Sequence, residues 1–285
     1  MVPAMLKWIG NKQRFAETIV SYMPETINNY YEPFLGSGAV MAELLSSDMT
    51  MLFPKINHAH GSDILPFLIE IFNLAKNNPS VLTDYYEAII PKYYESPDET
   101  YNEIRDRFNS DHNALDFLLL SRTCYSGVIR FRKLDGYMST PKGPHKPIQP
   151  ETFRKRISQW NQLLQKADFS CESYIDVLNR PQDGDVVYCD PPYTHSQGII
   201  YGAQDFDINV LWEKIAACKS RGAKVLLSIN GMRDSQKTDI SVTPPEGLFE
   251  RHLLISCGTS MIDRLQNTGK EMTDKKVDDQ LLLTW

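Results

Sequence analysis

The chain has 285 residues, which allows one large domain or two small ones. Hydrophobic residues make up 42 % and charged residues 23 %, and this composition excludes disordered and fibrous proteins. The mean hydropathy is -0.36, no run approaches about 18 apolar residues, and the first residues lack a signal-peptide core. The five cysteines form no CxxC pair, which argues against a disulfide framework and a zinc site. We therefore expect a soluble, cytoplasmic protein with no membrane association.

Charge is unevenly distributed along the chain. The net charge of -6 and the pI of about 5.6 speak weakly against a nucleic-acid-binding protein. Residues 122–156, however, contain nine Lys and Arg residues and only two acidic ones. Such a basic strip can contact a phosphate backbone while the acidic remainder keeps the protein in solution. The alternative is a solvated loop with no partner.

The first predicted elements are a strand, a glycine turn and a helix. Residues 30–40 (YYEPFLGSGAV) run from an apolar segment through Gly36-Ser37-Gly38 into helical spacing. Residues 56–63 predict a second strand that ends at Asp63, and a mostly helical region follows from 66 to 120. The next segment, 127–150, is rich in Gly and Pro, which predicts a loop or hairpin.

The second half of the chain alternates between strands and helices. Helices are expected at 151–167 and 208–222, the latter ending at Gly222. Strands are expected at 168–174, 185–190, 224–229, 249–256 and 279–285, the last two as an antiparallel pair at the sheet edge. This order predicts an α/β sheet formed by residues 1–65 and 153–285, with a mainly helical insertion at 66–152.

Two segments have the residues for a cofactor site. The Gly-Ser-Gly turn allows a ligand close to the backbone, and the helix after it offers unpaired N–H groups. Asp63 ends the next strand, at the position where a carboxylate binds ribose hydroxyls. A structural turn and a helix cap are the alternatives for these two features.

Asp190-Pro191-Pro192-Tyr193 is the most specific segment. It follows the apolar strand VVYC, and two prolines end that strand because neither can donate a backbone hydrogen bond. The Asp190 carboxylate and the neighbouring carbonyls form a stiff set of acceptors that suits an amino group. Tyr193 offers an aromatic face for a planar base. The alternative is a proline-rich strand exit without chemistry.

The histidines give no sign of a metal site. His58, His60, His145 and His195 show no ligand spacing, and we expect surface or polar packing positions for them. His195 follows the Asp-Pro-Pro-Tyr segment and is a candidate for lining its pocket.

The segments LKWIGNK, EPFLGSG and DPPY occur in an order that resembles the Dam-type DNA adenine-N6 methyltransferases. The stretch SRTCYSGVIRFRKLDGYMSTPKG is similar to the DNA-recognition region of that family, and FSCESY and KKVDDQLLLTW resemble two of its strands. The resemblance implies a Rossmann-like, S-adenosyl-L-methionine-dependent methyltransferase fold in which the helical insertion is the target-recognition domain. It also implies methyl transfer to N6 of an adenine flipped out of double-stranded DNA.

The resemblance assigns roles to individual residues. The implied catalytic residues are Asp190, Pro191, Pro192 and Tyr193. The implied cofactor-binding residues are Trp8, Lys12, Glu32, Pro33, Phe34, Gly36, Asp63 and Asp190, with Ser173 or Tyr174 near the cofactor adenine. The implied DNA-binding residues are Lys7, Tyr125, Ser126, Arg130, Arg132 and Lys142. No metal is required.

Three positions depart from the family pattern. Asn11 replaces a glycine of the N-terminal motif, while Ser126 and Arg132 stand where asparagines are usual. The last two lie in the recognition loop, so we expect a target other than the GATC of the family, as in methylases paired with a cognate restriction endonuclease. The sequence leaves the oligomeric state open.

Several other functions share parts of this pattern. A cytosine-N4 methyltransferase usually has Ser-Pro-Pro-Tyr, and an RNA or protein-glutamine methyltransferase usually has Asn-Pro-Pro-Tyr. A DNA-binding module that lost catalysis would not need the combination of Lys12, the glycine turn, Asp63 and Asp190. A cofactor-binding titration separates that module from an enzyme.

Overall fold

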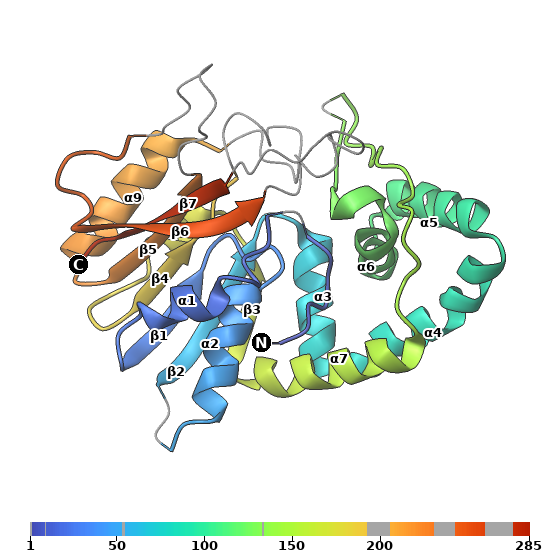
Figure 1. Cartoon of the computed structure of the whole chain (residues 1–285), viewed down its shortest axis with the longest axis horizontal. Helices are drawn as coiled ribbons and strands as arrows, with labels where there is room; N and C mark the ends of the chain where they lie inside the picture. The colour runs from blue at the N-terminus through green and yellow to red at the C-terminus, as the bar shows by residue number, and fades with distance from the viewer. Residues whose placement is uncertain are drawn as a thin grey trace.

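The computed structural model describes residues 2–8, 10–52, 55–132, 134–192, 206–230, 243–259 and 276–285. Its centre is a seven-stranded sheet in the order β3-β2-β1-β4-β5-β7-β6 (Figure 1). The strands are β1 (Ile27–Glu32), β2 (Ile56–Asp63), β3 (Ala167–Cys171), β4 (Val186–Cys189), β5 (Lys224–Asn230), β6 (Arg251–Thr259) and β7 (Lys276–Leu283). Strands β1 to β5 are parallel, and β7 is antiparallel to both β5 and β6.

Alternate residues of the strands face two apolar layers. Tyr188 on β4 packs into the larger cluster with Tyr30 and with helices α1 (Ala16–Ser21), α2 (Ala39–Met49) and α3 (Pro66–Asn77). Val187 and Cys189 face the smaller cluster, which contains α8 (Tyr174–Val177) and α9 (Ile208–Ser220). Because strand side chains alternate between faces, helices on both sides of a parallel sheet keep these strands buried.

The predicted insertion is mainly helical, with α4 (Pro79–Glu95), α5 (Pro97–Asp111) and α6 (Ala114–Thr123) beyond α3 (Figure 1). Helix α7 (Pro150–Leu163) returns along α4 and α3 toward the sheet. The larger apolar cluster is continuous from Tyr30 on β1 through Phe72 on α3 to Tyr101 on α5. The insertion therefore shares its hydrophobic core with the sheet. Its domain boundaries at residues 66 and 152 stay a prediction.

The strand predicted over 168–174 is wrong at its end. Strand β3 stops at Cys171, and Tyr174 opens helix α8 instead. Ser173 causes the change, because its hydroxyl accepts a hydrogen bond from the Ile175 N–H at 3.2 Å and caps the helix.

Among the described residues, no helix combines the length and the apolar composition that crossing a membrane requires.

Candidate active site

Three acidic residues stand at the carboxyl ends of neighbouring strands. Glu32 ends β1, Asp63 ends β2 and Asp190 follows the last residue of β4. The chain leaves β1 toward β2 on one side, and β4 pairs with β1 on the other. This reversal is the point at which open parallel sheets bind ligands.

Asp190 is held by an ion pair with Lys12. The Lys12 Nζ lies 2.8 Å from the Asp190 Oδ1, and the two side chains are 6 % and 20 % exposed. This ion pair ties the N-terminal segment (residues 2–8 and 10–12) to the end of β4. Within the segment, Lys12 also donates to the Gly10 carbonyl at 3.3 Å. Pro191 is buried and Pro192 partly exposed, whereas Tyr193 lies outside the described residues.

Glu32 is buried beside the same strand ends. The Tyr30 hydroxyl donates to the Glu32 Oε2 at 2.7 Å. Burial raises the pKa of Glu32 to about 8, and the nearby Asp190 charge adds to the increase. Glu32 is therefore largely protonated at neutral pH.

The Gly-Ser-Gly turn brings the chain close to Trp8. Gly36 and Gly38 have φ values of +47° and +65°, which side chains with a Cβ rarely adopt. A Cβ at Gly36 would lie 2.9 Å from the Trp8 Nε1. The turn therefore needs glycine for its backbone conformation and, at Gly36, for space.

Asp63 fixes the turn to the end of β2. Its Oδ2 accepts the Gly36 N–H at 3.1 Å, and its Oδ1 accepts the Leu65 N–H at 3.2 Å. Burial raises the pKa of Asp63 to about 6, although these backbone donors oppose the increase. At neutral pH the carboxylate is therefore charged and held in one orientation.

Three aromatic side chains pack together beyond the end of β1. Phe34 stacks on Tyr174 with ring centroids 5.2 Å apart and meets Phe206 edge-on at 5.9 Å. The Tyr174 hydroxyl donates to the Asp207 carbonyl at 3.1 Å. Pro33 is buried before Phe34, so the segment after β1 presents Phe34 toward α8. The sequence indicated Tyr174, whereas Phe206 lies 32 positions later with no motif around it.

The N-terminal segment joins the helical region to this site. The carbonyls of Pro3, Ala4 and Met5 accept hydrogen bonds from Trp160, Arg156 and Arg122 at 2.9, 3.1 and 2.6 Å. Farther along, a Cβ at Gly127 would lie 3.2 Å from the Lys7 Cβ, so this segment also lies against the loop that follows α6. The same segment then reaches Trp8 and Lys12.

Residues 122–156 do not form one exposed basic strip, because Arg122 is buried. Its side chain is 2 % exposed and supports the N-terminal segment. Other members of the strip are paired on the surface: Lys142 with Asp98 at 3.5 Å, and Arg154 with Glu87. The free positive charge is therefore smaller than the composition of the strip indicates.

Residues 124–142 form an irregular antiparallel hairpin that rises above α5 and α6 (Figure 1). Cys124 pairs with Lys142 and Phe131 with Met138. The structure brings the predicted DNA-binding residues Lys7, Tyr125, Ser126, Arg130, Arg132 and Lys142 to this hairpin and the chain beside it.

The hairpin exposes several of these side chains. Tyr125 is 42 % exposed, Arg130 is exposed, and Ser126 has a left-handed φ of 57°. Arg132 pairs with Asp135 at 2.6 Å and lies 4.3 Å over the Tyr137 ring.

Leu134 is an exposed apolar residue that the sequence reasoning missed. It lies between Arg132 and Asp135 at the hairpin tip, and its side chain is 95 % exposed. An apolar residue in a predicted turn of a basic segment is the sequence pattern that would have indicated Leu134.

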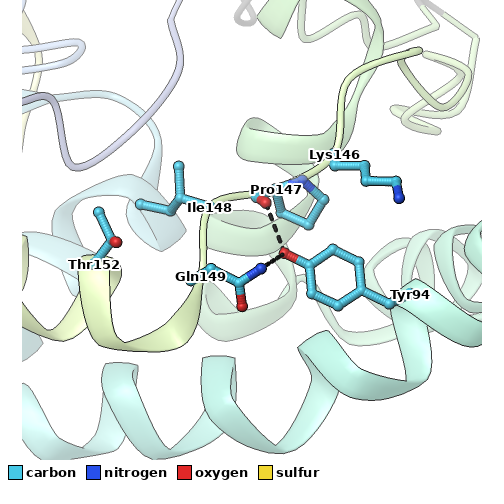
Figure 2. Close-up of a pocket in the computed structure, with 6 residues that line it drawn as sticks. All are labelled: Tyr94, Lys146, Pro147, Ile148, Gln149 and Thr152. Atoms are coloured by element: carbon cyan, nitrogen blue, oxygen red, sulfur yellow. Dashed lines mark hydrogen bonds between the residues drawn. The ribbon is translucent and has the colours of Figure 1, made fainter.

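A shallow pocket of about 390 Å³ lies between α4 and the start of α7 (Figure 2). It is lined by Tyr94, Lys146, Pro147, Ile148, Gln149 and Thr152. The Tyr94 hydroxyl donates to the Pro147 carbonyl at 2.9 Å and accepts from the Gln149 Nε2 at 3.2 Å (Figure 2). These bonds fasten the loop before α7 to α4, and the predicted site residues take no part in the pocket.

Comparison with known proteins decides the family. Residues 8–250 match the family described as D12 class N6 adenine-specific DNA methyltransferase. The chain belongs to this family. The chain is 32 % identical over 241 residues to the DNA adenine methylase of Vibrio cholerae, and the alignment covers 79 % of this chain and 80 % of that one. It is 33 % identical over 200 residues to the DNA adenine methylase of Escherichia coli K12, covering 67 % and 64 %.

Among solved structures the chain has more distant neighbours. The rRNA methyltransferase aviRa from Streptomyces viridochromogenes aligns over 95 % of this chain and 84 % of that one, with a TM-score of 0.38 and 14 % identity. A likeness this low supports no argument about function. The family match and the curated relatives confirm the predicted class of enzyme, an adenine-specific DNA methyltransferase.

Proposed function

We propose that this adenine-specific DNA methyltransferase transfers a methyl group from S-adenosyl-L-methionine to N6 of an adenine flipped out of double-stranded DNA. The observation that carries the proposal is Asp190 at the end of β4, ion-paired to Lys12 at 2.8 Å and followed by two prolines. A base stacked inside the duplex cannot present its amino group to the partly buried Asp190, which is why flipping is needed.

The residues at the strand ends fit S-adenosyl-L-methionine. Gly36 has no side chain, so a ligand can approach its backbone beside Trp8. Asp63 offers a charged carboxylate to which ribose hydroxyls can donate hydrogen bonds. Trp8, Lys12, Glu32, Pro33, Phe34, Gly36, Asp63 and Asp190 are the residues that would hold the cofactor. When bound, it supplies an electrophilic methyl group on its sulfonium.

Asp190 acts as a hydrogen-bond acceptor for the adenine amino group. Together with a carbonyl of Pro191 or Pro192 it accepts the two N6 hydrogens, which makes the nitrogen lone pair more available. Lys12 fixes the Asp190 carboxylate through the contact at Oδ1. Tyr193 stacks on the flipped ring. Asp190 need not be a strong base, since N6 becomes acidic only after it is alkylated, and alignment of the reacting atoms is the main contribution.

The hairpin supplies the contacts to DNA. Arg130, Arg132 and Ser126 are the candidates for reading base edges, and Lys7, Tyr125 and Lys142 those for phosphate or sugar contacts. Leu134 at the tip has the exposure of a side chain that contacts the bases or sugars directly. The departures at Ser126 and Arg132 support a target other than GATC, as in methylases that act beside a cognate restriction endonuclease. The composition of the chain supports a cytoplasmic location.

Substitution of Asp190 tests the proposed chemistry. Asp190→Asn keeps the size of the side chain but weakens its acceptor character, so methyl transfer should fall at least 100-fold, on the scale at which transition-state contacts act. DNA affinity should stay within about threefold of the unsubstituted protein. Transfer is measured with labelled cofactor, and binding by fluorescence anisotropy.

Asp176→Asn is the matched control, because Asp176 is an exposed carboxylate on α8. It should leave both measurements unchanged. Normal turnover in the Asp190→Asn protein would contradict the proposed role.

A further inference from the structure

A second cluster of polar side chains lies on the sheet away from the strand ends. His58 and His60 are alternate residues of β2 and therefore point to the same face. Asp168 on β3 pairs with His60 in the parallel register, so its side chain projects from that face as well. One ligand atom from each of the three residues lies within 4.8 Å of the others. His60 precedes Asp63 by three residues, so the cluster lies about 10 Å along β2 from Asp63 and the candidate active site.

Neighbouring groups orient the three side chains. The His58 Nε2 lies 2.8 Å from the Asp168 Oδ2, while the Asp168 Oδ1 accepts from the Lys76 Nζ at 2.8 Å. The His60 ring stacks on Tyr31 with centroids 4.8 Å apart and an angle of 19°. Outer contacts of this kind fix the imidazoles and carboxylates that bind metals in proteins.

We propose that His58, His60 and Asp168 form a binding site for a divalent transition-metal ion of the zinc type. Two imidazole nitrogens and one carboxylate oxygen are ligands that Zn²⁺ prefers, and a fourth position is left for water. Ligand bonds of about 2.0–2.2 Å place neighbouring ligand atoms roughly 3.4 Å apart in a tetrahedral site. The contact between His58 and Asp168 must lengthen slightly and the other gaps must close, which rotation of partly exposed side chains can achieve.

Charge determines which ions the cluster selects. Lys76 neutralises Asp168, so the site has little net negative charge to attract Mg²⁺ or Ca²⁺. Those ions also need more oxygen ligands than one carboxylate provides. Zn²⁺ gains from the two imidazoles instead. The bound ion would join β2 to the edge strand β3, so its expected effect is on stability and not on methyl transfer.

Titration of the purified full-length chain, stripped with a chelator, tests the site. Calorimetry with Zn²⁺ should give one ion per chain in the micromolar range, and saturating Zn²⁺ should raise Tm while the same concentration of Mg²⁺ does not. His58→Gln and His60→Gln should each weaken Zn²⁺ binding at least tenfold and remove the increase in Tm. Circular dichroism of each variant without metal verifies that it is folded.

Two control variants separate this cluster from other ligands. His145→Gln removes an exposed histidine outside the cluster, and Cys171→Ser removes an exposed thiol near the end of β3. Both should bind Zn²⁺ as the unsubstituted chain does. Loss of binding in Cys171→Ser, unchanged binding in both cluster variants, or no saturable binding would each overturn the proposal.

Discussion

Gly36 lets Trp8 approach the turn after β1, and this contact can be tested with one methyl group. Gly36→Ala adds a Cβ 2.9 Å from the Trp8 Nε1 at a residue with a φ of +47°. Left-handed strain costs about 1–2 kcal/mol, and the steric contact adds to it. We expect S-adenosyl-L-methionine to bind about tenfold more weakly, as measured by calorimetry.

Gly136→Ala is the control for strain alone. Gly136 has a φ of +67° at the hairpin tip, with no atom near the added Cβ. Its substitution should leave cofactor affinity unchanged. An equal loss of affinity in both variants would show that the contact with Trp8 does not matter.

The raised pKa of Glu32 makes stability depend on pH. The folded state holds the Glu32 proton up to about pH 8, whereas the unfolded chain releases it near pH 4.5. Between these values the folded state binds the extra proton, so the free energy of unfolding decreases as pH rises, with a limiting slope of about 1.4 kcal/mol per pH unit.

Glu32→Gln removes this titration and keeps an oxygen for the Tyr30 hydroxyl. Urea denaturation between pH 5.5 and 8 should therefore show the stability of the unsubstituted protein falling relative to Glu32→Gln. Curves that stay parallel over this range would contradict a protonated Glu32.

At the scale of elements, the N-terminal segment depends on Arg122. Arg122→Met removes the donor to the Met5 carbonyl, a charge-assisted hydrogen bond whose loss costs about 1.5–3 kcal/mol. The N-terminal segment should then detach from α6 at least tenfold more often. Trypsin should therefore cleave the native protein after Lys7 at least tenfold faster, and mass spectrometry follows this cleavage. The half-buried Arg156 donates at 3.1 Å to Ala4, so Arg156→Met should have a smaller effect. Equal rates in the unsubstituted and Arg122→Met proteins would exclude this role.

The hairpin is the element expected to respond to salt. Arg130→Ala removes an exposed charge from it, so the slope of log affinity for DNA against log salt should decrease by about 1. Because Arg130 is a candidate for reading base edges, affinity for the target sequence should also fall more than affinity for other sequences. Arg154→Ala, on α7 and paired with Glu87, should change neither quantity. Arg130→Ala with unchanged affinity and slope would remove the hairpin from the interface.

Local sequence signals predicted most elements but not their distant contacts. The Gly-Ser-Gly turn, the strand that ends at Asp63 and the antiparallel pair β6 and β7 all follow from glycine, alternation and apolar runs. The hydroxyl of Ser173 ended β3 early, because a helix cap competes with strand propensity. The burial of Arg122 under Met5 and the gathering of His58 with Asp168 depend on contacts more than 100 residues apart. Spacing along the chain gives no signal for such pairs.

At the scale of the whole molecule, both the sheet and the helical region position the residues of the candidate active site. The larger apolar cluster spans both, and the N-terminal segment extends from α6 and α7 to Trp8 and Lys12. The chain presents a modest basic hairpin on an acidic body with a net charge of -6. Binding to DNA should therefore depend on a few contacts at the hairpin instead of a broad positive surface.

The most direct measurement identifies the modified base. The protein is incubated with S-adenosyl-L-methionine and unmethylated genomic DNA, and the DNA is digested to nucleosides and analysed by mass spectrometry, with Asp190→Asn as the control. We expect N6-methyladenine with the unsubstituted protein and at least 100-fold slower formation of this base with the variant. N4-methylcytosine alone, or no methylated base although the cofactor binds, would contradict the proposed function.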